Sequence, residues 1–297
     1  MSAPVGGSGS LVRRAGTLAR PPWALELTAD DAEWTWSSLR VLELPAGSSC
    51  SFETKDDEIL VVPLEGSCDV ASGGMAFALA GREDVFCGAS DFAYVPKDAQ
   101  VTVSSIEGGR FAVPGARASK RLPFRYQPAD KVVVELRGAG RCSRRVTNLC
   151  MGGEFAADML IVCEVFTPSG NWSSYPPHKH DEDRPGEAVL EEIYYFEVAD
   201  GPGGPGVAFQ RVYGTADRPI DVLAEVRSGD IVLVPHGWHG PSMAPPGYDL
   251  YYLNVMAGPG RREWLATNDP TYSWVRDTWA DEEVDPRIST RERHGAQ

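Results

Sequence analysis

The chain is poor in histidine and in basic residues, and it contains no long apolar run. Only 5 histidines occur among its 297 residues. A membrane-spanning helix needs about 20 consecutive apolar residues, so the sequence excludes a helical membrane protein. Lys and Arg number 28 against 42 Asp and Glu, which gives a formal net charge of −14. Because such a surface repels phosphate backbones and anionic lipid head groups, we expect neither nucleic acid nor a membrane as a partner.

Cysteine is also sparse, and its spacing forms neither a CxxC pair nor a disulfide framework. The six cysteines are Cys50, Cys68, Cys87, Cys142, Cys150 and Cys163. Scattered cysteines of this kind predict buried free thiols in the reducing cytoplasm. The segment up to Arg20 lacks the apolar core of a secretory signal, so we expect a frayed tail there. The charged stretch from Asp281 to Gln297 predicts a second, solvated tail.

Helical periodicity is absent, whereas short β-favouring runs separated by turn residues are frequent. The 31 glycines and 23 prolines supply those turns. The predicted strands are Trp34 to Leu44, Ile59 to Val62, Ala93 to Val95, Val101 to Val103, Lys131 to Arg137, Met159 to Phe166, Ile193 to Val198, Ala208 to Tyr213, Ile231 to Val234 and Leu250 to Met256. This pattern predicts an all-β chain of two sandwiches or barrels.

The boundary between the two predicted units lies near the middle of the chain. Pro123 and Pro128 interrupt regular structure between Lys120 and Asp130, which is typical of a linker. We therefore predict an N-terminal β domain over residues 1–130 and a C-terminal domain over residues 131–297.

The two halves share a pattern in which an acidic entry into a strand is followed by a strand that ends in Val-Pro. In the first half these are Asp56 to Gly66 and Asp91 to Pro96; in the second they are Glu191 to Phe196 and Gly229 to Pro235. The repeat favours a duplicated plan. Because the first half contains no histidine, only the second half is expected to carry metal chemistry.

Four of the five histidines form two tight pairs, His178-Lys-His180 and His236-Gly-Trp-His239. Residues two apart on a β-strand face the same side, so His178 and His180 present two imidazoles together while Lys179 points away. One metal ion can accept both imidazoles.

The strand that begins at Glu191 can bring a carboxylate back to the first pair. Glu192 is the better candidate, because Tyr194 and Phe196 share its face, whereas Glu191 shares the opposite face with Ile193. The choice between the two glutamates stays open at this point.

Either His236 or His239 can complete the site. We favour His239, because it follows the Pro-His-Gly-Trp turn. A set of three histidines and one glutamate suits Zn, Mn, Fe, Ni or Cu, so the residues predict a transition-metal site without naming its metal. The competing interpretation places His178 and His180 on a solvent-facing hairpin and His236 at a turn.

These residues resemble the two motifs of the cupin family. The first motif is a Gly, then His-x-His, a spacer and a Glu; the second is a Gly, a Pro and a later His. The matching residues are Gly170, His178, His180 and Glu192 for the first motif and Gly229, Pro235, Gly237 and His239 for the second. The spacer after His180 is longer than the usual one, and His239 comes one position early.

Longer runs resemble the 5-deoxy-glucuronate isomerases of myo-inositol catabolism, which are two-cupin relatives of the 5-keto-4-deoxyuronate isomerases. The runs that carry this resemblance are Asn171-Trp-Ser-Ser-Tyr-Pro-Pro-His-Lys-His-Asp, Glu191-Glu-Ile-Tyr-Tyr-Phe, Phe209-Gln-Arg-Val-Tyr, Val234-Pro-His-Gly-Trp-His-Gly-Pro and Asn268-Asp-Pro-Thr-Tyr-Ser-Trp. The resemblance implies a bicupin of two tandem jelly-roll β-barrels and conversion of 5-deoxy-D-glucuronate to 5-dehydro-2-deoxy-D-gluconate in the cytoplasm. It also implies a homo-oligomer.

The same resemblance implies a divalent metal in the C-terminal cupin, with zinc first and manganese or iron as alternatives. The implied ligands are His178, His180, Glu192 and His239. The N-terminal cupin would carry no metal ligands.

An isomerase of this kind also needs groups that move a proton and hold the substrate. The reaction passes through an enediol-like state whose negative charge a divalent metal stabilises. The candidates for the base or proton shuttle are Tyr194, Tyr252 and His236. The carboxylate of a uronate calls for a guanidinium that binds it in a bidentate fork, for which Arg144 and Arg211 are the candidates.

Two other functions are compatible with the same metal ligands. One is an Fe(II) cupin dioxygenase, which metal analysis and oxygen uptake would distinguish from an isomerase. The other is a non-catalytic sugar-binding bicupin, which would bind metal without turnover.

Overall fold

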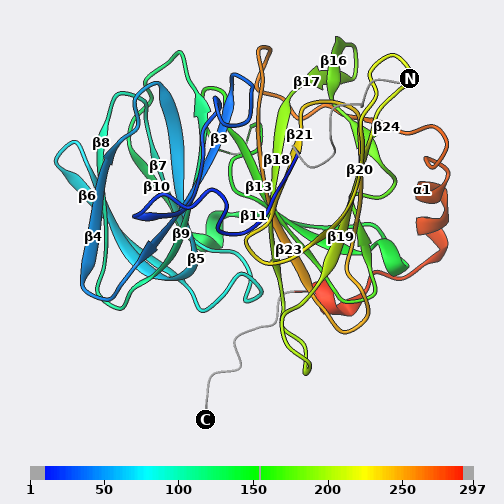
Figure 1. Cartoon of the computed structure of the whole chain (residues 1–297), viewed down its shortest axis with the longest axis horizontal. Coiled ribbons are helices and arrows are strands. Elements are labelled where there is room, and N and C mark those ends of the chain that lie inside the picture. The colour runs from blue at the N-terminus through cyan, green and yellow to red at the C-terminus, as the bar shows by residue number, and fades with distance from the viewer. Residues whose placement is uncertain (1–10, 154, 290–297) are drawn as a thin grey trace, which may run out of the picture.

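Two β-barrels lie side by side along the long axis of the molecule, one from each half of the chain (Figure 1). The computed structural model describes residues 11–153 and 155–289. The predicted all-β class is confirmed. The helical segments are short, and they are α1 (Val275–Thr278) and 3-10 turns at Ala129–Lys131, Gly140–Cys142, Trp279–Asp281 and Pro286–Ile288.

The N-terminal barrel is a single antiparallel sheet that folds over on itself. Its strands are β2 (Trp23–Leu27), β3 (Ser37–Leu44), β4 (Ser48–Glu53), β5 (Asp57–Ser72), β6 (Met75–Arg82), β7 (Phe92–Val95), β8 (Gln100–Ser105), β9 (Gly109–Arg117) and β10 (Arg125–Gln127). The main path runs β10-β7-β5-β9-β3-β2. The long strand β5 also pairs with β6 and β8, so it links the two layers of the barrel.

The C-terminal barrel consists of two large sheets and one small hairpin. Its strands are β11 (Val133–Arg137), β12 (Arg144–Asn148), β13 (Ile161–Thr167), β14 (Trp172–Ser173), β15 (His178–Lys179), β16 (Asp181–Arg184), β17 (Glu187–Val189), β18 (Glu191–Val198), β19 (Ala208–Tyr213), β20 (Asp221–Val226), β21 (Ile231–Val234), β22 (Trp238–Met243), β23 (Leu250–Ala257) and β24 (Thr267–Asn268). One sheet has the order β1-β21-β18-β23-β13-β12-β11, where β1 is Val12–Arg13. The other has the order β20-β19-β22-β15-β24, with β14 beside β22.

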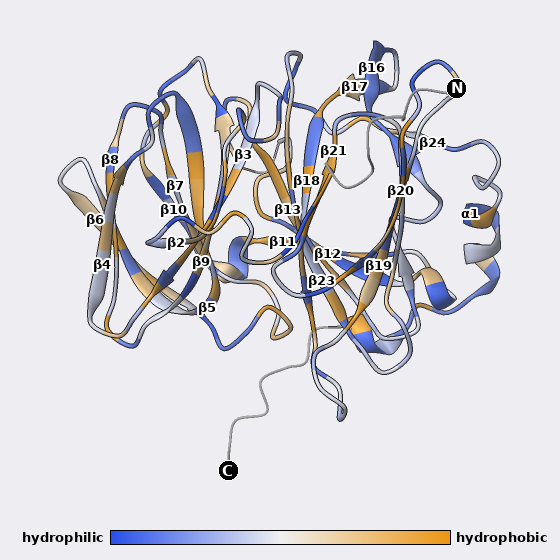
Figure 2. Ribbon diagram, in the orientation of Figure 1, coloured by the Kyte–Doolittle hydropathy of each residue, from blue (hydrophilic) through white to orange (hydrophobic). Residues whose placement is uncertain are grey.

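The central strands of the seven-stranded sheet are buried on both faces. Along β18, Tyr194 and Phe196 face the core of the C-terminal barrel, whereas Ile193 and Tyr195 join a core shared with the N-terminal barrel. Strand β23 alternates in the same way. Figure 2 accordingly shows these central strands as predominantly hydrophobic. A sheet that is covered on both sides holds its inward side chains in fixed positions, which matters for the site described below.

Two carboxylates, of the buried Glu58 and the half-buried Glu191, join the barrels reciprocally through backbone amides. Glu58 of β5 accepts hydrogen bonds from the backbone N–H groups of residues 158–160, at 2.6 to 2.9 Å. Glu191 of β18 accepts them from the backbone N–H groups of residues 35–37, at 2.8 to 3.0 Å. Because each carboxylate satisfies three amides of the opposite half, the two barrels are fixed in register with each other.

The expected N-terminal tail is wrong for residues 11–20. Strand β1 pairs antiparallel with β21, so that Val12 lies opposite Val232. Arg14 donates a hydrogen bond at 2.7 Å to Asp230, which also accepts one from the backbone N–H of Ala15. The apolar residues and the aspartate partner hold this segment against the C-terminal barrel, which composition alone does not indicate.

The expected linker contains a strand, and one cysteine is not buried. Residues 125–127 form β10, which pairs with β7, so Lys120 to Asp130 is only partly irregular. All six cysteines are free. Cys87 is exposed, which contradicts the expected burial, and Cys50 and Cys142 are half-buried. The predicted tail from Asp281 is described as far as residue 289, and its remainder lies outside the described residues.

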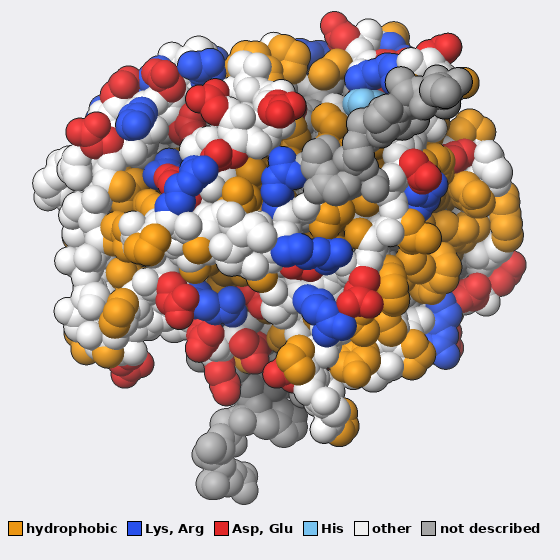
Figure 3. Space-filling view, in the orientation of Figure 1, with side chains coloured by type: hydrophobic (Ala, Val, Ile, Leu, Met, Phe, Trp, Pro, Cys, Tyr) orange, Lys and Arg blue, Asp and Glu red, His pale blue; other side chains and the backbone are white. Residues whose placement is uncertain are grey.

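Charged side chains of both signs are interspersed over the face of the molecule that Figure 3 shows. In the described ranges 11–153 and 155–289, no helix combines the length and the apolar character that a bilayer crossing requires.

A buried ion pair crosses the interface between the barrels. Arg82 of β6 and Glu164 of β13 form a bidentate pair in which each side chain is 3% exposed. Tyr251 of β23 donates a further hydrogen bond to Glu164 at 2.7 Å. Burial alone would lower the pKa of Arg82, but Glu164 outweighs it and raises that pKa. The guanidinium therefore stays charged and depends on its partner.

We predict that Glu164→Gln lowers the free energy of unfolding by about 3 to 5 kcal/mol, because it leaves the Arg82 guanidinium buried without a counter-ion. Urea unfolding measures this change. Glu65→Gln is the matched control: Glu65 is 54% exposed and pairs with Arg110, so its loss should cost about 1 kcal/mol or less. Equal midpoints for the two variants would contradict the prediction.

Candidate functional site

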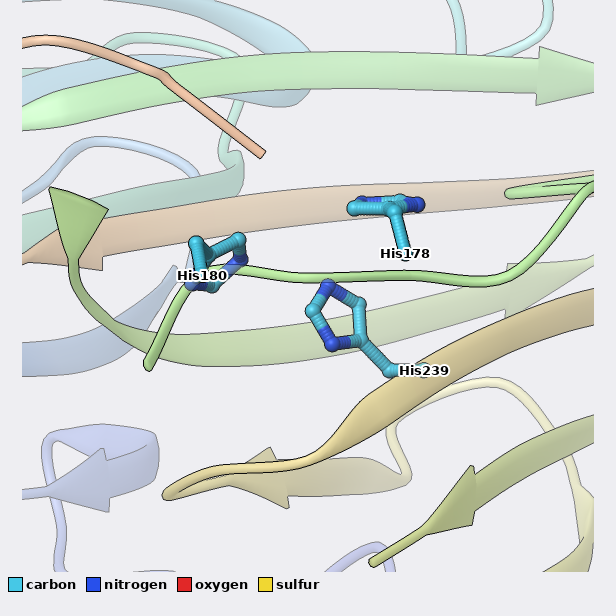
Figure 4. A group of neighbouring side chains, drawn as sticks. All are labelled: His178, His180 and His239. Carbon is cyan, nitrogen blue, oxygen red and sulfur yellow. The ribbon is translucent and has the colours of Figure 1, made fainter. Parts of the chain in front are cut away.

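Three histidines converge inside the C-terminal barrel. His178 of β15 lies directly opposite His239 of β22, and His180 follows the end of β15 (Figure 4). Their rings are 4.4 Å apart for His178 and His239, and 4.6 Å apart for His180 and His239. One ligand atom from each of the three lies within 4.8 Å of the others. The backbone pairing of β15 with β22 therefore brings His239 beside His178, which lies 61 positions earlier in the sequence.

Glu192 completes this cluster from the opposite sheet. Its Oε2 atom lies 3.0 Å from Nε2 of His180 and 3.0 Å from Nε2 of His239. Glu191 points to the other side of β18, where it binds the backbone of the N-terminal barrel. The alternation of the strand thus separates the two glutamates that the sequence leaves as alternatives.

Backbone carbonyls fix the orientation of two of the imidazoles. Nδ1 of His180 lies 3.1 Å from the carbonyl oxygen of Leu190, and Nδ1 of His239 lies 3.0 Å from that of Gly237. A carbonyl only accepts, so Nδ1 carries the proton and the Nε2 lone pair of each neutral ring faces inward. A hydrogen bond from the other ring nitrogen to a backbone carbonyl is typical of histidines that bind a metal.

One nitrogen at the centre of the cluster lacks a hydrogen-bond partner among the described residues. Nε2 of His239 is buried, and its ring is not aligned for a hydrogen bond with Glu192 in spite of the short distance. When both rings are neutral, the Nε2 lone pairs of His180 and His239 and an oxygen of Glu192 crowd one position, where a cation would satisfy all of them. The donor set and this orphaned atom fit a divalent transition metal.

Burial and the mutual charges set the protonation of the metal-free cluster. Burial holds the pKa of His178 well below its usual value. Burial also disfavours protonation of His180, but the hydrogen bond with Glu192 outweighs it and raises that pKa. Burial would raise the pKa of Glu192, yet His239 and His180 together lower it below the ordinary range. The carboxylate is thus held ionised at a site rich in imidazole.

The unusually long spacer between His180 and Glu192 is a hairpin made of β16 and β17. Lys179 points away from the histidines, as expected, and its Nζ lies 2.6 to 2.8 Å from Asp181, Glu182 and Glu187. The backbone N–H of Leu190 donates to the carbonyl of His180 at 3.0 Å, which closes the base of the hairpin. The insertion therefore holds His180 in place without displacing it from the cluster.

A cavity of about 320 Å³ opens beside His178 and Glu192. Tyr194 and Tyr252 line it, and their hydroxyl groups lie 3.3 and 3.0 Å from Oγ of Ser174. Burial raises the pKa of both tyrosines, so the phenols are neutral at physiological pH. They can donate or relay a proton, whereas neither is ionised and ready to act as a base.

The two predicted arginines occupy different environments. Arg144 of β12 is 8% exposed and lines the cavity. Arg211 of β19 points to the outer face, where it pairs with Asp221 and lies 5.2 Å from the ring of Tyr213. Strand alternation explains the difference, because Gln210 and Val212 occupy the inward positions beside Arg211.

His236 is not among the residues that line the cavity. It is half-buried, and Arg218 and Asp181 are the charged groups that act on it. The turn after β21 directs the first histidine of the pair away from the cavity and the second one, in β22, toward the cluster.

Sequence reasoning missed several residues of the cavity wall. Arg137, Asn254, Trp264, Arg276 and Trp279 all line the cavity. Asn254 could have been found from the alternation of Tyr252 along β23. Arg276 and Trp279 follow the predicted strands in a segment without periodicity, so their return to the barrel carries no signal in the sequence.

Similar proteins match this chain in sequence over most of their length. A protein of Geobacillus kaustophilus named 5-deoxy-glucuronate isomerase is 43% identical over 86% of this chain and 91% of its own length. One of the same name from Bacillus subtilis (strain 168) is 40% identical over 84% of this chain and 91% of its own length.

Solved structures agree with the fold. An IolB-like protein of Salmonella typhimurium LT2 has a TM-score of 0.82 and 33% identity, covering 89% of this chain and 98% of its own. An oxalate decarboxylase of Lactobacillus farciminis has a TM-score of 0.63 and 11% identity, covering 90% of each chain, which shows the fold alone. The architecture is that of a bicupin, as the sequence motifs implied.

The length of chain that these matches cover shows which protein family the chain belongs to. The family model described as KduI/IolB matches residues 11–275, which include both barrels and the whole histidine cluster. The chain belongs to the KduI/IolB family.

Proposed function

We propose that the chain is a metal-dependent aldose–ketose isomerase that converts 5-deoxy-D-glucuronate to 5-dehydro-2-deoxy-D-gluconate in myo-inositol degradation. The observation that carries this proposal is a buried cluster of three histidines and a glutamate beside a cavity, in a chain 43% identical to a named 5-deoxy-glucuronate isomerase. The named relatives at 40% identity or more are isomerases, which favours neither a dioxygenase nor a non-catalytic bicupin. Free thiols on all six cysteines suit the cytoplasm, where we place the enzyme.

The proposed metal ligands are His178, His180, Glu192 and His239, and zinc is the first candidate, followed by manganese and iron. A bound divalent metal would polarise the carbonyl and the neighbouring hydroxyl of the sugar and stabilise negative charge on oxygen. The carbonyl contacts at Nδ1 of His180 and His239 keep both imidazoles aimed at the same point. Glu192 contributes one negative charge, so the site would retain a net positive charge with a divalent ion.

Tyr252 and Tyr194 are the proposed proton-carrying groups. Both are neutral phenols, and Ser174 lies between their hydroxyl groups. A proton can therefore pass along three hydroxyl groups that face the cavity. His236 does not line the cavity, so the geometry gives no support to a role for it.

The first prediction concerns turnover itself. Purified metal-loaded protein incubated with 5-deoxy-D-glucuronate should produce the keto acid, and a chelator should abolish the reaction because the metal stabilises the charge that develops on oxygen. NMR detects the product. Restored activity after adding back Zn, Mn or Fe separately ranks the metals. Product formation at an undiminished rate in protein shown to be metal-free would contradict the proposal.

The second prediction separates the two adjacent glutamates. Glu192→Gln should lose most bound metal and lower kcat by about 10²-fold or more, because a neutral amide replaces the ionised ligand. Glu191→Gln is the matched control, since Glu191 holds the backbone of residues 35–37 instead; it should keep metal content and lower only the unfolding midpoint. Elemental analysis and thermal unfolding measure the two effects.

His178→Ala should behave like Glu192→Gln in this comparison. The ligand assignment would fail if either variant retained full metal content and full activity, or if Glu191→Gln lost the metal instead.

The third prediction concerns the two tyrosines of β23. Tyr252→Phe should lower kcat by about 10²-fold with little change in metal content, because it removes a hydroxyl that moves a proton. Tyr251→Phe is the control on the opposite face of the strand, where the hydroxyl donates to Glu164. That variant should lower stability and leave kcat unchanged. A Tyr252→Phe enzyme with wild-type kcat would assign the proton transfer elsewhere.

A further inference from the structure

Three arginines line the cavity, although the chain as a whole carries a negative net charge. Arg137 ends β11, Arg144 begins β12, and Arg276 lies on α1. Among the described residues that line the cavity, Glu192 is the one acidic side chain, and it belongs to the histidine cluster. Arg137 pairs with Glu135 at 2.7 Å, whereas neither Arg144 nor Arg276 has a carboxylate partner among the described residues. In a chain with a net charge of −14, this wall of the cavity is therefore cationic.

Arg144 is the deepest of the three and has no carboxylate partner among the described residues. Its Nη1 donates to the carbonyl of Cys142 at 3.0 Å. Burial, together with the neighbouring Arg137 and Arg276, lowers the pKa of Arg144 to about 10. A guanidinium this buried normally lies beside a counter-ion, because burying an unpaired charge costs several kcal/mol. Because the Arg144 guanidinium lacks a counter-ion, we expect an anionic ligand beside it.

One tryptophan holds two of the arginines together. The guanidinium carbons of Arg144 and Arg276 each lie 5.5 Å from the ring centre of Trp279. The same arrangement recurs at Trp264, where Arg137 lies 5.5 Å from the ring centre, and the other neighbour is His178. The aromatic rings thus orient the guanidinium groups and connect them to the histidine cluster.

The segment that carries Arg276 and Trp279 is anchored to the barrel on its far side. The backbone N–H of Gly140 donates to the carbonyl of Glu283 at 2.8 Å. Asp285 accepts a hydrogen bond from Asn171 at 3.0 Å, and its backbone N–H donates to Ser143 at 2.9 Å. These contacts hold residues 275–285 against β12 and the turn before β14, so the segment forms a fixed wall of the cavity.

Two neutral donors on the same wall also lack partners among the residues the structure describes. Nδ2 of Asn254 is buried, and the residue is 4% exposed. Nε1 of Trp279 is buried as well. An anion with several oxygen atoms would satisfy both donors together with the guanidinium groups.

We propose that Arg144, Arg276 and Trp279, with Arg137 and Asn254 beside them, form the subsite that binds the carboxylate of the substrate. The inference rests on the proposed function for the identity of that carboxylate. It assigns the opposite end of the sugar, where the carbonyl lies, to the histidine cluster. It also transfers the role that the sequence suggested for Arg211 to Arg276, which lies 65 positions further along the chain.

The test compares Arg144→Gln and Arg276→Gln with Arg227→Gln, an exposed arginine that pairs with Glu225 away from the cavity. The KM for 5-deoxy-D-glucuronate should rise about ten- to hundred-fold in the first two variants, because each loses a charge-assisted hydrogen bond to the carboxylate. The control should keep the wild-type KM. Arg276→Lys should recover part of the loss, since it retains the charge but not the fork.

A binding experiment separates this inference from the proposed function. Trp264 and Trp279 line the cavity, so their fluorescence reports binding of D-gluconate, an anion, and of D-glucitol, its neutral counterpart. The metal-loaded protein should prefer gluconate by about ten-fold or more, and both glutamine variants should lose that preference while D-glucitol binds as before. Arg276 is at the rim, so that variant is expected to fold even if Arg144→Gln does not.

Each result decides one of the two claims. Absent isomerase activity together with a gluconate preference that Arg276→Gln abolishes would overturn the proposed function and support the subsite. Isomerase activity with an unchanged KM in Arg276→Gln would overturn the subsite and leave the proposed function intact. An unchanged gluconate preference in the glutamine variants would also overturn the subsite.

Discussion

The period-two alternation of side chains along β18 is the constraint on which the rest of the structure depends. Two adjacent glutamates begin this strand and point to opposite sides. Glu192 enters the histidine cluster, whereas Glu191 binds three backbone amides of the other barrel. A slip of one residue in the pairing of β18 with β23 would turn Glu192 to the interface side, and Glu191 or Ile193 would take its place at the cluster, depending on the direction of the slip. Site and interface therefore depend on the same register.

This coupling gives the histidine-free barrel a physical role. Its strands β3 and β9 cover the face of the central sheet opposite the cluster, so that sheet has no solvated side in its middle. The charged groups at the interface are paired, Arg82 with Glu164 and Arg110 with Glu197, and each glutamate also accepts a hydrogen bond from a tyrosine hydroxyl. Such buried pairs penalise any other arrangement of the barrels, because separating the partners would leave charges unpaired. The histidine-free barrel thus holds the strands of the cluster in fixed positions.

Local pattern was sufficient to predict the all-β class, the histidine pairs and the inward face of β18. These features depend on spacing within single strands, which the sequence displays directly. It was not sufficient for strands with one polar face, such as β4 and β20, whose alternation is mixed with turn residues. It also failed for Arg211, whose inward or outward direction depends on the register of β19. Arg276 and Trp279 reach the cavity only through tertiary contacts far away in the chain, and no local pattern encodes such contacts.

The apparent repeat between the two halves is another feature for which the local sequence pattern is misleading. Asp57-Glu58-Ile59 and Glu191-Glu192-Ile193 look equivalent in sequence. In the structure, however, Glu58 and Glu191 are the residues that bind the opposite barrel, so the matching positions differ by one residue. Ile59 faces the core of its own barrel, whereas Ile193 faces the shared core. Residues that match in the two sequence segments can therefore lie on opposite faces of the corresponding strands.

The pairing of β1 with β21 has a consequence for how the chain is made. Val12 and Arg13 are synthesised long before Ile231 and Val232, with which they pair. Until the ribosome has released β21, the first strand has no partner and the edge of the central sheet does not exist. Non-local pairing of this kind is slow to form and leaves strand edges open to other chains. A fusion tag placed close to Val12 would occupy the space beside this late-forming edge, so the protein should be more sensitive to the length of an N-terminal linker than its distance from the cavity would indicate.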